Sequence, residues 1–494
     1  MAKKFLAVAA LLLASVFTFV ACSGDNYAFD ALSDNPAATD TVKSNGGIYV
    51  EKGKYSYFVN GAQSSSASNE FGVHHKGSIV RCLTSDLTKA DRNVEVVVPK
   101  VIYAGDLDSS GFYIYGDKIY YTTANNVKDA NGNVQYNKLD FMSVNLDGTG
   151  TQLIATIDDN LNPFNIVEKN GEVYILYYTD VTKTVNGEET TVKAIKQINA
   201  QTKEQKLVAD DVSSYAFDRS EGGVKVAFTK TIRKKVVATG QETEENYNEL
   251  YVYSVGDEEA SLVVSGKVED SAKRTKYTVQ TMSGGYVYYT YQTTMTADKA
   301  LAKASSSQDI VKLVDSEYSS FIPFNENGKD GIYVVENGWF KKITFANGEK
   351  EPEVLLAKSN VSSGATINLE KVYGGYLYFT VQEEENVTTG ILYRIKTDEA
   401  NQEKAYTVVS GSMASTWTNF DFTTVNGEVA VVYFNESESL KFLNYTYMDV
   451  FAFDAEGEED IKSKRIGRLT ENDSKSAVEN GDDKNAVDAA DKFI

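Results

Sequence analysis

A glycine followed by an aromatic-rich run of strand-forming residues recurs eight times along this chain, between residues 47 and 470. Tyr, Val, Phe and Thr favour strands, and only five prolines interrupt the 494 residues. Successive glycines are 44 to 63 residues apart, which is the range of propeller blades. The glycines and their runs are Gly53 (KYSYFV), Gly116 (DKIYYTT), Gly171 (EVYILYY), Gly223 (VKVAF), Gly285 (YVYYTY), Gly331 (IYVV), Gly375 (YLYFTV) and Gly427 (EVAVVYF).

Each unit also has a second half. A further strand-like run follows the first and often carries a basic residue, as in SIVRCLT (78–84) and ILYRIK (391–396). A turn, a third apolar run such as QLIA (152–155) and a connecting run such as FNIV (164–167) complete most units. We therefore predict an all-β fold: a single β-propeller of four-stranded antiparallel blades, with eight blades favoured and seven as the next choice.

Other folds explain the pattern less well. Stacked independent sandwiches are the structural alternative, but they do not account for one glycine-to-turn unit that recurs eight times. Helical periodicity is weak throughout, and the best stretch, residues 297–304, ends in serines.

The first residues carry a targeting signal. Lys3 and Lys4 precede an apolar run, as in a secretory signal peptide. The junction Phe19-Val20-Ala21-Cys22 resembles the bacterial lipobox, in which a small residue precedes a cysteine that becomes acylated. This resemblance implies a lipoprotein signal peptide over residues 1–21 and lipidation of Cys22. The protein would then be anchored in a bacterial cell membrane by lipid, on the extracytoplasmic face. An ordinary cleavage site beside a coincidental cysteine is the alternative.

Composition divides the rest of the chain. Residues 22–46 are polar, small and aperiodic, and are predicted to form a flexible tether from the lipidated cysteine. Residues 47–470 hold the propeller, and residues 471–494 form an acidic tail predicted to be disordered. With Cys22 assigned to lipid, Cys82 has no disulfide partner and is predicted to be a buried, inert thiol.

Short segments of the repeats resemble those of a known group of β-propellers. Short segments such as 117–121 (DKIYY), 145–150 (NLDGTG) and 392–395 (LYRI) are similar to propellers of the low-density-lipoprotein-receptor type. They are also similar to the bacterial relatives of those propellers, a domain of unknown function common in surface lipoproteins. This sequence has long inserts and lacks the YWTD signature, so no calcium or ligand residue is carried over. The resemblance implies a fold and a binding role, and assigns no chemistry.

The extra length falls at one place in most units, between the run after the glycine and the next run. In a propeller such insertions emerge on the same face, and we expect them to form binding loops. The inserts are residues 60–77, 123–138, 179–193, 229–249, 291–307, 381–390 and 435–448, and the binding-face candidates in them are Glu245, Tyr247, Asn386, Tyr445 and Tyr447. Solvated hairpin tips are the alternative interpretation of the same acidic, hydroxylated sequences.

The net charge and the scarcity of histidine and cysteine argue against several functions. A formal net charge of −21 without a basic stripe argues against nucleic acid as a partner. Two histidines and the absence of GxSxG, HExxH, Walker A and paired CxxC motifs leave no residue to predict as catalytic or metal-binding, and no cofactor is predicted.

Three functions are compatible with these patterns. We expect a membrane-anchored binding module whose insert loops contact a glycan, a peptide or an envelope protein. The alternatives are a carboxylate-dependent polysaccharide hydrolase or lyase, and an envelope assembly scaffold. Catalysis by paired carboxylates stays open because their separation is invisible in a sequence with 70 acidic residues.

Overall fold

The structure is a computed structural model that describes residues 31–465 with gaps. The gaps are residues 60–78, 88–92, 94, 99–110, 125–130, 132–137, 159–162, 186–187, 239–240, 268–273, 294–298, 315–317, 327–328, 347–348, 360, 362–364, 385–386, 404–405, 408–419, 426–427, 437–443 and 454–458. Cys22 and the predicted tail lie outside the described residues.

The described strands form eight antiparallel sheets, each built from strands that are consecutive in the chain. The first contains β1 (Val42–Lys43), β2 (Tyr49–Lys52), β3 (Tyr55–Val59), β4 (Ile79–Leu83) and β5 (Glu95–Val98), with a short 3-10 turn, η2 (Thr84–Asp86), after β4. The second contains β6 (Tyr113–Tyr115), β7 (Lys118–Ala124), β8 (Leu139–Asn145) and β9 (Gln152–Ile157).

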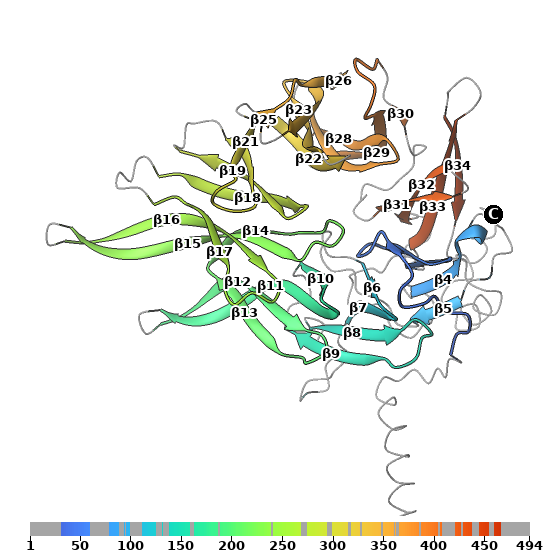
Figure 1. The fold of residues 1–494 in the computed structure, drawn as a ribbon, viewed down its shortest axis with the longest axis horizontal. Coiled ribbons are helices and arrows are strands. Elements are labelled where there is room, and N and C mark those ends of the chain that lie inside the picture. The colour runs from blue at the N-terminus through green and yellow to red at the C-terminus, as the bar shows by residue number, and fades with distance from the viewer. Residues whose placement is uncertain are drawn as a thin grey trace, which may run out of the picture.

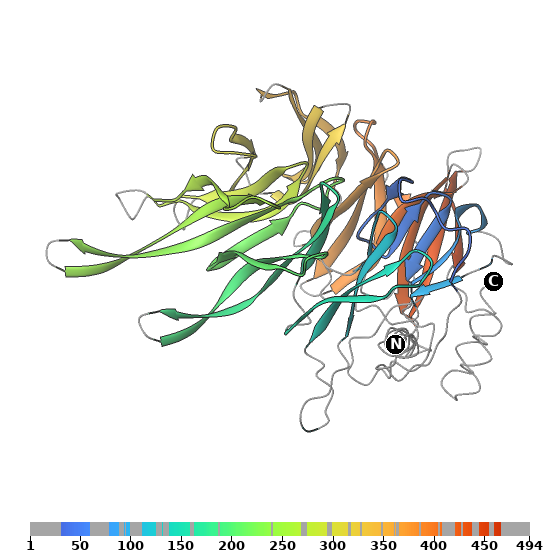
Figure 2. The ribbon, with the colours of Figure 1, turned by 60° about the horizontal axis from the view of Figure 1, so that its bottom comes forward.

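The third and fourth sheets contain the longest strands. The third is β10 (Phe164–Lys169), β11 (Glu172–Val185), β12 (Glu188–Asn199) and β13 (Gln205–Asp210). The fourth is β14 (Val212–Phe217), β15 (Lys225–Ala238), β16 (Gln241–Ser254) and β17 (Ser261–Ser265). The hairpins β11–β12 and β15–β16, which we call the two ribbons, extend beyond the other sheets (Figures 1 and 2).

The remaining sheets complete the ring (Figure 1). The fifth is β18 (Lys276–Ser283), β19 (Tyr286–Gln292), β20 (Ala300–Ala304) and β21 (Val311–Val314). The sixth is β22 (Tyr318–Glu326), β23 (Lys329–Glu336), β24 (Trp339–Ala346), β25 (Glu349–Lys350) and β26 (Val354–Lys358), in which both β25 and β26 pair with β24. The seventh is β27 (Thr366–Tyr373), β28 (Tyr376–Glu384), β29 (Val387–Lys396) and β30 (Tyr406–Thr407), and the eighth is β31 (Phe420–Val425), β32 (Glu428–Glu436), β33 (Asn444–Phe453) and β34 (Glu459–Arg465).

The hydrophobic cores lie between successive sheets. One cluster joins the first and second sheets, and five more join the second to the third and so on to the seventh. A middle sheet therefore buries apolar side chains on both of its faces, which is why strands such as β23 are buried over six consecutive residues. Sheets packed face to face in sequence order make a β-propeller, so the predicted fold class is confirmed.

The two ends of the ring meet through residues 44–47. Ser44 Oγ donates to the carbonyl oxygen of Phe422 in β31, at 3.3 Å. The Asn45 side chain bonds the backbone of Ile114 in β6. The seventh and eighth sheets are joined by the stacked rings of Tyr373 and Phe422. The first and last sheets therefore contact each other through side chains and do not share a strand among the described residues.

The consecutive antiparallel order defines two faces. In the five-stranded first sheet β1 is an additional strand, so β2 to β5 are counted as its first to fourth strands. The turns between first and second strands, and between third and fourth strands, lie on one side of the ring, which we call the turn face. The hairpins between second and third strands lie on the opposite side, which we call the hairpin face. The ribbons β11–β12 and β15–β16 belong to the hairpin face.

The recurrent glycine is explained by the turn face. Gly53, Gly116, Gly171, Gly285 and Gly375 lie in the turns between first and second strands, with φ between 57° and 83°. These left-handed values favour a residue without a Cβ. The glycine therefore recurs in the sequence because the same turn recurs in the structure. Gly331 differs because it lies inside β23.

Three sequence-based expectations differ from the structure. Residues 179–193 and 229–249 were expected as insert loops, but most of them belong to the paired strands of the two ribbons. Residues 300–304 were expected within the insert 291–307, but they form strand β20, with all five residues buried. Residues 31–46, predicted within a flexible tether, lie along the first two sheets, where β1 pairs with β2.

Candidate functional site

The sequence-predicted binding residues lie on two hairpins. Glu245 and Tyr247 are in β16, opposite Lys234 and Ile232 of β15. Tyr445 and Tyr447 are in β33, opposite Asn435 and Tyr433 of β32. These hairpins belong to the fourth and eighth sheets and lie on different sides of the ring (Figure 1), so the structure does not bring the two pairs together.

Tyr247 is a poor candidate for a contact residue because its side chain is only 7 % exposed. Asn386 lies outside the described residues. The location of Glu245, Tyr445 and Tyr447 on second-to-third-strand hairpins agrees with the expected face, and their binding role stays a prediction.

A different set of side chains is brought together by the fold. The first strands β14, β18, β22 and β27 each contain a β-bulge, at which one extra residue opposes the second strand. The four extra residues are Ser213, Gln280, Ser319 and Glu370, and all four are exposed. We call this set the inner rim, because first strands line the middle of the ring (Figure 1), where β14 contacts β18 and β22 contacts β27.

Each inner-rim side chain is held by the second strand of its own sheet. Ser213 Oγ lies 2.6 Å from Thr231 Oγ1, and Gln280 Nε2 donates to Thr290 Oγ1 at 3.4 Å. Ser319 Oγ donates to the carbonyl oxygen of Val335 at 3.4 Å, and Thr380 Oγ1 donates to Glu370 Oε1 at 2.7 Å. The polar atoms are therefore oriented while their side chains stay accessible.

Serines adjacent to the bulges connect neighbouring sheets. The Oγ of Ser214 accepts a hydrogen bond from the N–H of Val279, at 2.9 Å. The Oγ of Ser320 accepts one from the N–H of Leu369, at 3.0 Å. Val279 directly precedes the bulge residue Gln280, and Leu369 directly precedes Glu370. These hydrogen bonds therefore place the bulges of the fourth and fifth sheets side by side, and likewise the bulges of the sixth and seventh sheets.

Glu370 is the acidic member of the inner rim. The Glu370 residue keeps accessible surface, but surrounding protein atoms displace much of the water around its carboxyl group. This loss of hydration raises the pKa of Glu370 above its usual value, and the hydrogen bond from Thr380 only partly offsets that effect. A carboxyl group with a raised pKa can donate or accept a proton closer to neutral pH than an ordinary glutamate.

The chemistry of the inner rim is that of hydrogen bonding. Two hydroxyls, one carboxamide and one carboxyl group offer both donors and acceptors to a polar ligand. Among the described residues, no group of three His, Cys, Asp or Glu side chains is placed to hold a metal ion. No helix in the described part of the chain is long and apolar enough to cross a membrane. Cys82 is buried in β4, as predicted.

Sequence reasoning missed the inner rim because a bulge depends on pairing with another strand. A partial signal was present: the pair Ser213-Ser214 and the pair Ser319-Ser320 both precede an aromatic residue in a first strand. The other two bulges, at Gln280 and Glu370, carry no such doublet.

No protein-family model matches this chain, and no curated protein matches its sequence significantly. Solved structures resemble it at the level of the backbone. A structure from a study of two prolyl endopeptidases has 11% identity and a TM-score of 0.39, with 84% of this chain and 54% of that chain covered. The β-propeller domain of the Trilobed protease from Pyrococcus furiosus has 11% identity and a TM-score of 0.35, with 74% and 97% covered.

TolB from Acinetobacter baumannii has 11% identity and a TM-score of 0.28, with 79% and 76% covered. This chain spans 54% to 62% of the length of the first three peptidase structures it resembles. At these identities and scores, no activity, substrate or partner of those proteins is transferred to this chain. The propeller fold rests on the chain's own sheets and intervening cores.

Proposed function

We propose that this protein is a lipid-anchored extracytoplasmic binding module that contacts a polar ligand through its inner rim. The observation that supports binding is the set of four exposed polar side chains at matching bulges, Ser213, Gln280, Ser319 and Glu370. The ligand class is a glycan, a peptide or an envelope protein, because these offer the hydroxyl and amide groups that such side chains bind.

The anchor is proposed from the lipobox-like junction at Cys22. Its test is the mass of the mature N-terminal peptide and the sedimentation of the protein with membranes. We expect an acylated Cys22 in wild type and loss of membrane association in Cys22→Ser. An unmodified Cys22 in the mature protein would refute the anchor without affecting the binding proposal.

Binding is tested by affinity electrophoresis of the purified protein through gels that contain single soluble polysaccharides, together with a peptide array. The informative variant combines Gln280→Leu with Ser319→Val in the inner rim. Its matched control combines Gln205→Leu with Ser261→Val, which are exposed positions on the outermost strands β13 and β17. We expect the inner-rim variant to lose binding and the control to keep it, with both melting as wild type.

Equal loss of binding in both double variants would contradict the inner rim as the contact surface. Retention of wild-type binding by the inner-rim variant would do the same.

One observation favours a second candidate function. The raised pKa of Glu370 suits an acid catalyst in a carboxylate-dependent polysaccharide hydrolase or lyase. Purified protein that degrades a polysaccharide, with turnover abolished in Glu370→Gln while binding persists, would support this candidate. Undiminished turnover in that variant would exclude Glu370 as the acid.

A further inference from the structure

Residues 31–41, which we call the strap, are fixed to the turn face of the first two sheets. The N–H of Leu32 donates to the carbonyl oxygen of Asp147, in the turn between β8 and β9, at 3.0 Å. Lys52 Nζ, whose residue is fully buried, donates to the carbonyl oxygens of Ala38 and Asp40 at 3.1 and 3.0 Å.

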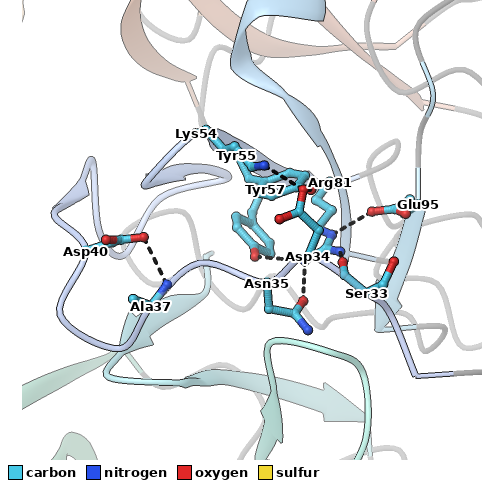
Figure 3. A network of polar contacts seen from close by, with 10 residues as sticks. All are labelled: Ser33, Asp34, Asn35, Ala37, Asp40, Lys54, Tyr55, Tyr57, Arg81 and Glu95. Carbon is cyan, nitrogen blue, oxygen red and sulfur yellow. Dashed lines mark hydrogen bonds and ion pairs between the residues drawn. The ribbon is translucent and has the colours of Figure 1, made fainter.

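Arg81 is the centre of the strap's polar network (Figure 3). Its guanidinium donates to Asn35 Oδ1 at 2.5 Å and to the carbonyl oxygen of Ser33 at 2.8 Å. Its Nε is paired with Glu95 at 2.8 Å, and its guanidinium carbon lies 4.4 Å from the centre of the Tyr55 ring. Arg81 is 0% exposed, so its guanidinium is shielded from water and its hydrogen bonds hold residues 33 and 35 of the strap against the first sheet.

The neighbouring strap residue is bound as well. Asp34 accepts hydrogen bonds from Lys54 Nζ at 2.5 Å and from Tyr55 Oη at 3.2 Å. Both partners lie at the turn between β2 and β3, where first and second strands meet. The strap thus enters the fold at the turn face, opposite the ribbons.

Chain length limits how far this entry point can be from a lipid on Cys22. The nine residue steps from Cys22 to Ala31 span at most about 30 Å when fully extended. From Glu189 near the end of one ribbon to Asn199 at its base, ten steps of strand cover about 33 Å. The ribbon end is therefore at least as far from the turn face as the whole anchoring segment can reach.

We propose that the strap sets the orientation of the propeller on the membrane, with the turn face toward the lipid and the ribbons pointing away from it. This inference rests on the proposed lipid anchor. It identifies the hairpin face, with both ribbons, as the surface accessible to partners, and the turn face as the surface next to lipid head groups.

The test places a fluorescent donor on each face of the lipidated full-length protein. Glu189→Cys labels a ribbon, and Glu259→Cys labels the turn between β16 and β17; both positions are exposed. Cys82 is buried and Cys22 is acylated under the proposal, so the introduced thiol is the reactive one. The protein is bound to phosphatidylcholine vesicles that carry an acceptor dye on the head groups. We expect stronger energy transfer from position 259 than from position 189.

A variant pair separates the strap from general stability. Arg81→Lys shortens the side chain and removes the forked donors to Ser33 and Asn35. Arg394→Lys is the matched control, because Arg394 is also 0% exposed and lies 4.0 Å from the Tyr376 ring, but belongs to the seventh sheet. We expect Arg81→Lys to reduce the difference in transfer between the two labels, and Arg394→Lys to leave it unchanged.

Equal or reversed transfer from the two labels in vesicle-bound wild type would overturn the orientation. An equal effect of the two arginine variants would overturn the role of the strap. Failure of the acylated protein to sediment with vesicles would instead refute the anchor on which the inference rests, so the two failures are distinguishable.

Discussion

Asn248 in β16 and Tyr277 in β18 join the fourth and fifth sheets through two hydrogen bonds of opposite direction. The Asn248 Nδ2 donates to the carbonyl oxygen of Tyr277 at 2.6 Å, and the N–H of Tyr277 donates to Asn248 Oδ1 at 3.1 Å. Asn45 and Ile114 repeat this arrangement between the first and second sheets, at 3.1 and 2.7 Å. A carboxamide can do this because it carries a donor and an acceptor side by side.

Asn248→Ala should therefore destabilise the protein by about 1–3 kcal/mol, because it leaves two backbone groups between sheets without their partner. The measurement is urea-induced unfolding followed by circular dichroism. Asn325→Ala, at an exposed asparagine of β22, is the control and should change stability little. Equal effects of the two substitutions would contradict a joining role for Asn248.

Lys303 in β20 is a buried basic residue that links the fifth and sixth sheets. Its Nζ lies 4.4 Å from the centre of the Tyr286 ring and 3.2 Å from Asp330 of the next sheet, and the residue is 4% exposed. We expect Lys303→Met to cost about 1–3 kcal/mol, since it removes a cation–π contact and leaves Asp330 without this partner. A double-mutant cycle with Asp330→Asn checks this: additive effects would show that the pair is not coupled.

The fold was predictable because its signals are local. In five of the eight units the recurrent glycine marks a turn with positive φ, and the aromatic runs mark strands buried on both faces. The strap was not predictable, because residues 31–41 have a polar, aperiodic composition and are held by Arg81 and Lys52 from elsewhere in the chain. The assignment of residues 291–307 to an insert missed strand β20, whose small side chains suit a tightly packed strand between two cores.

The candidate site was less predictable than the fold. Six of the seven insertions were correctly assigned to second-to-third-strand hairpins, and the seventh, 291–307, also includes strand β20. In the third and fourth sheets the inserted residues continue the sheet as ribbons. The pair Asn186-Gly187, a hairpin signal between two such runs, already pointed to this. The inner rim depends on the register between first and second strands, which no single segment encodes.

An acid in an ion pair stabilises the folded protein more as the pH rises through its pKa. Glu370 should have the opposite effect and stabilise the folded protein less as the pH rises. Its pKa is raised in the folded state by loss of hydration, so the folded protein binds this proton more tightly than the unfolded chain. That contribution to stability is present below the unfolded value of about 4.5 and is lost as pH rises through the folded pKa.

Glu370→Gln should consequently raise the melting temperature relative to wild type at pH 7, and this advantage should shrink as the pH approaches 4. Thermal melts of both proteins across this range provide the measurement. Thr380→Val, which removes the hydrogen bond that lowers the Glu370 pKa, should shift the crossover to higher pH. A constant difference between Glu370→Gln and wild type at all pH values would count against the raised pKa.

Asp210 joins the two ribbons, through Lys183 near the end of β11 and Lys230 in the first half of β15. Its carboxylate is 3.2 Å from Lys183 Nζ of β11 and 3.0 Å from Lys230 Nζ of β15, and Lys183 also pairs with Asp211. Burial opposes ionisation of Asp210, but the hydrogen bonds from Lys230 and Lys183 outweigh it and hold the Asp210 pKa below 3.8.

The stabilisation from Asp210 is therefore present above pH 3.8 and is lost as pH falls through the folded pKa. Asp210→Asn should lower stability at pH 7 by about 1 kcal/mol, and the difference from wild type should vanish in acid. Raising the salt concentration should also reduce it, because the carboxylate is partly exposed. A salt-independent loss would indicate a packing defect in place of the ion pairs.

Gly331 in β23 should tolerate a methyl group less well than a turn glycine. A Cβ at this position would lie 2.1 Å from Phe324 Cζ and 2.5 Å from the carbonyl oxygen of Ile343. The Ile343 oxygen belongs to the backbone of β24 and cannot rotate away, so the strands must separate. We expect Gly331→Ala to cost about 3 kcal/mol or more by overpacking.

Gly338→Ala is the matched control, because a Cβ there meets nothing within 4 Å and the cost is confined to its φ of +75°. That strain is about 1–2 kcal/mol. Chemical denaturation of both variants measures the difference, and a second-site change of Phe324→Leu should recover part of the Gly331→Ala loss. If Gly331→Ala were no more destabilising than Gly338→Ala, the close packing of β22, β23 and β24 around Gly331 would be wrong.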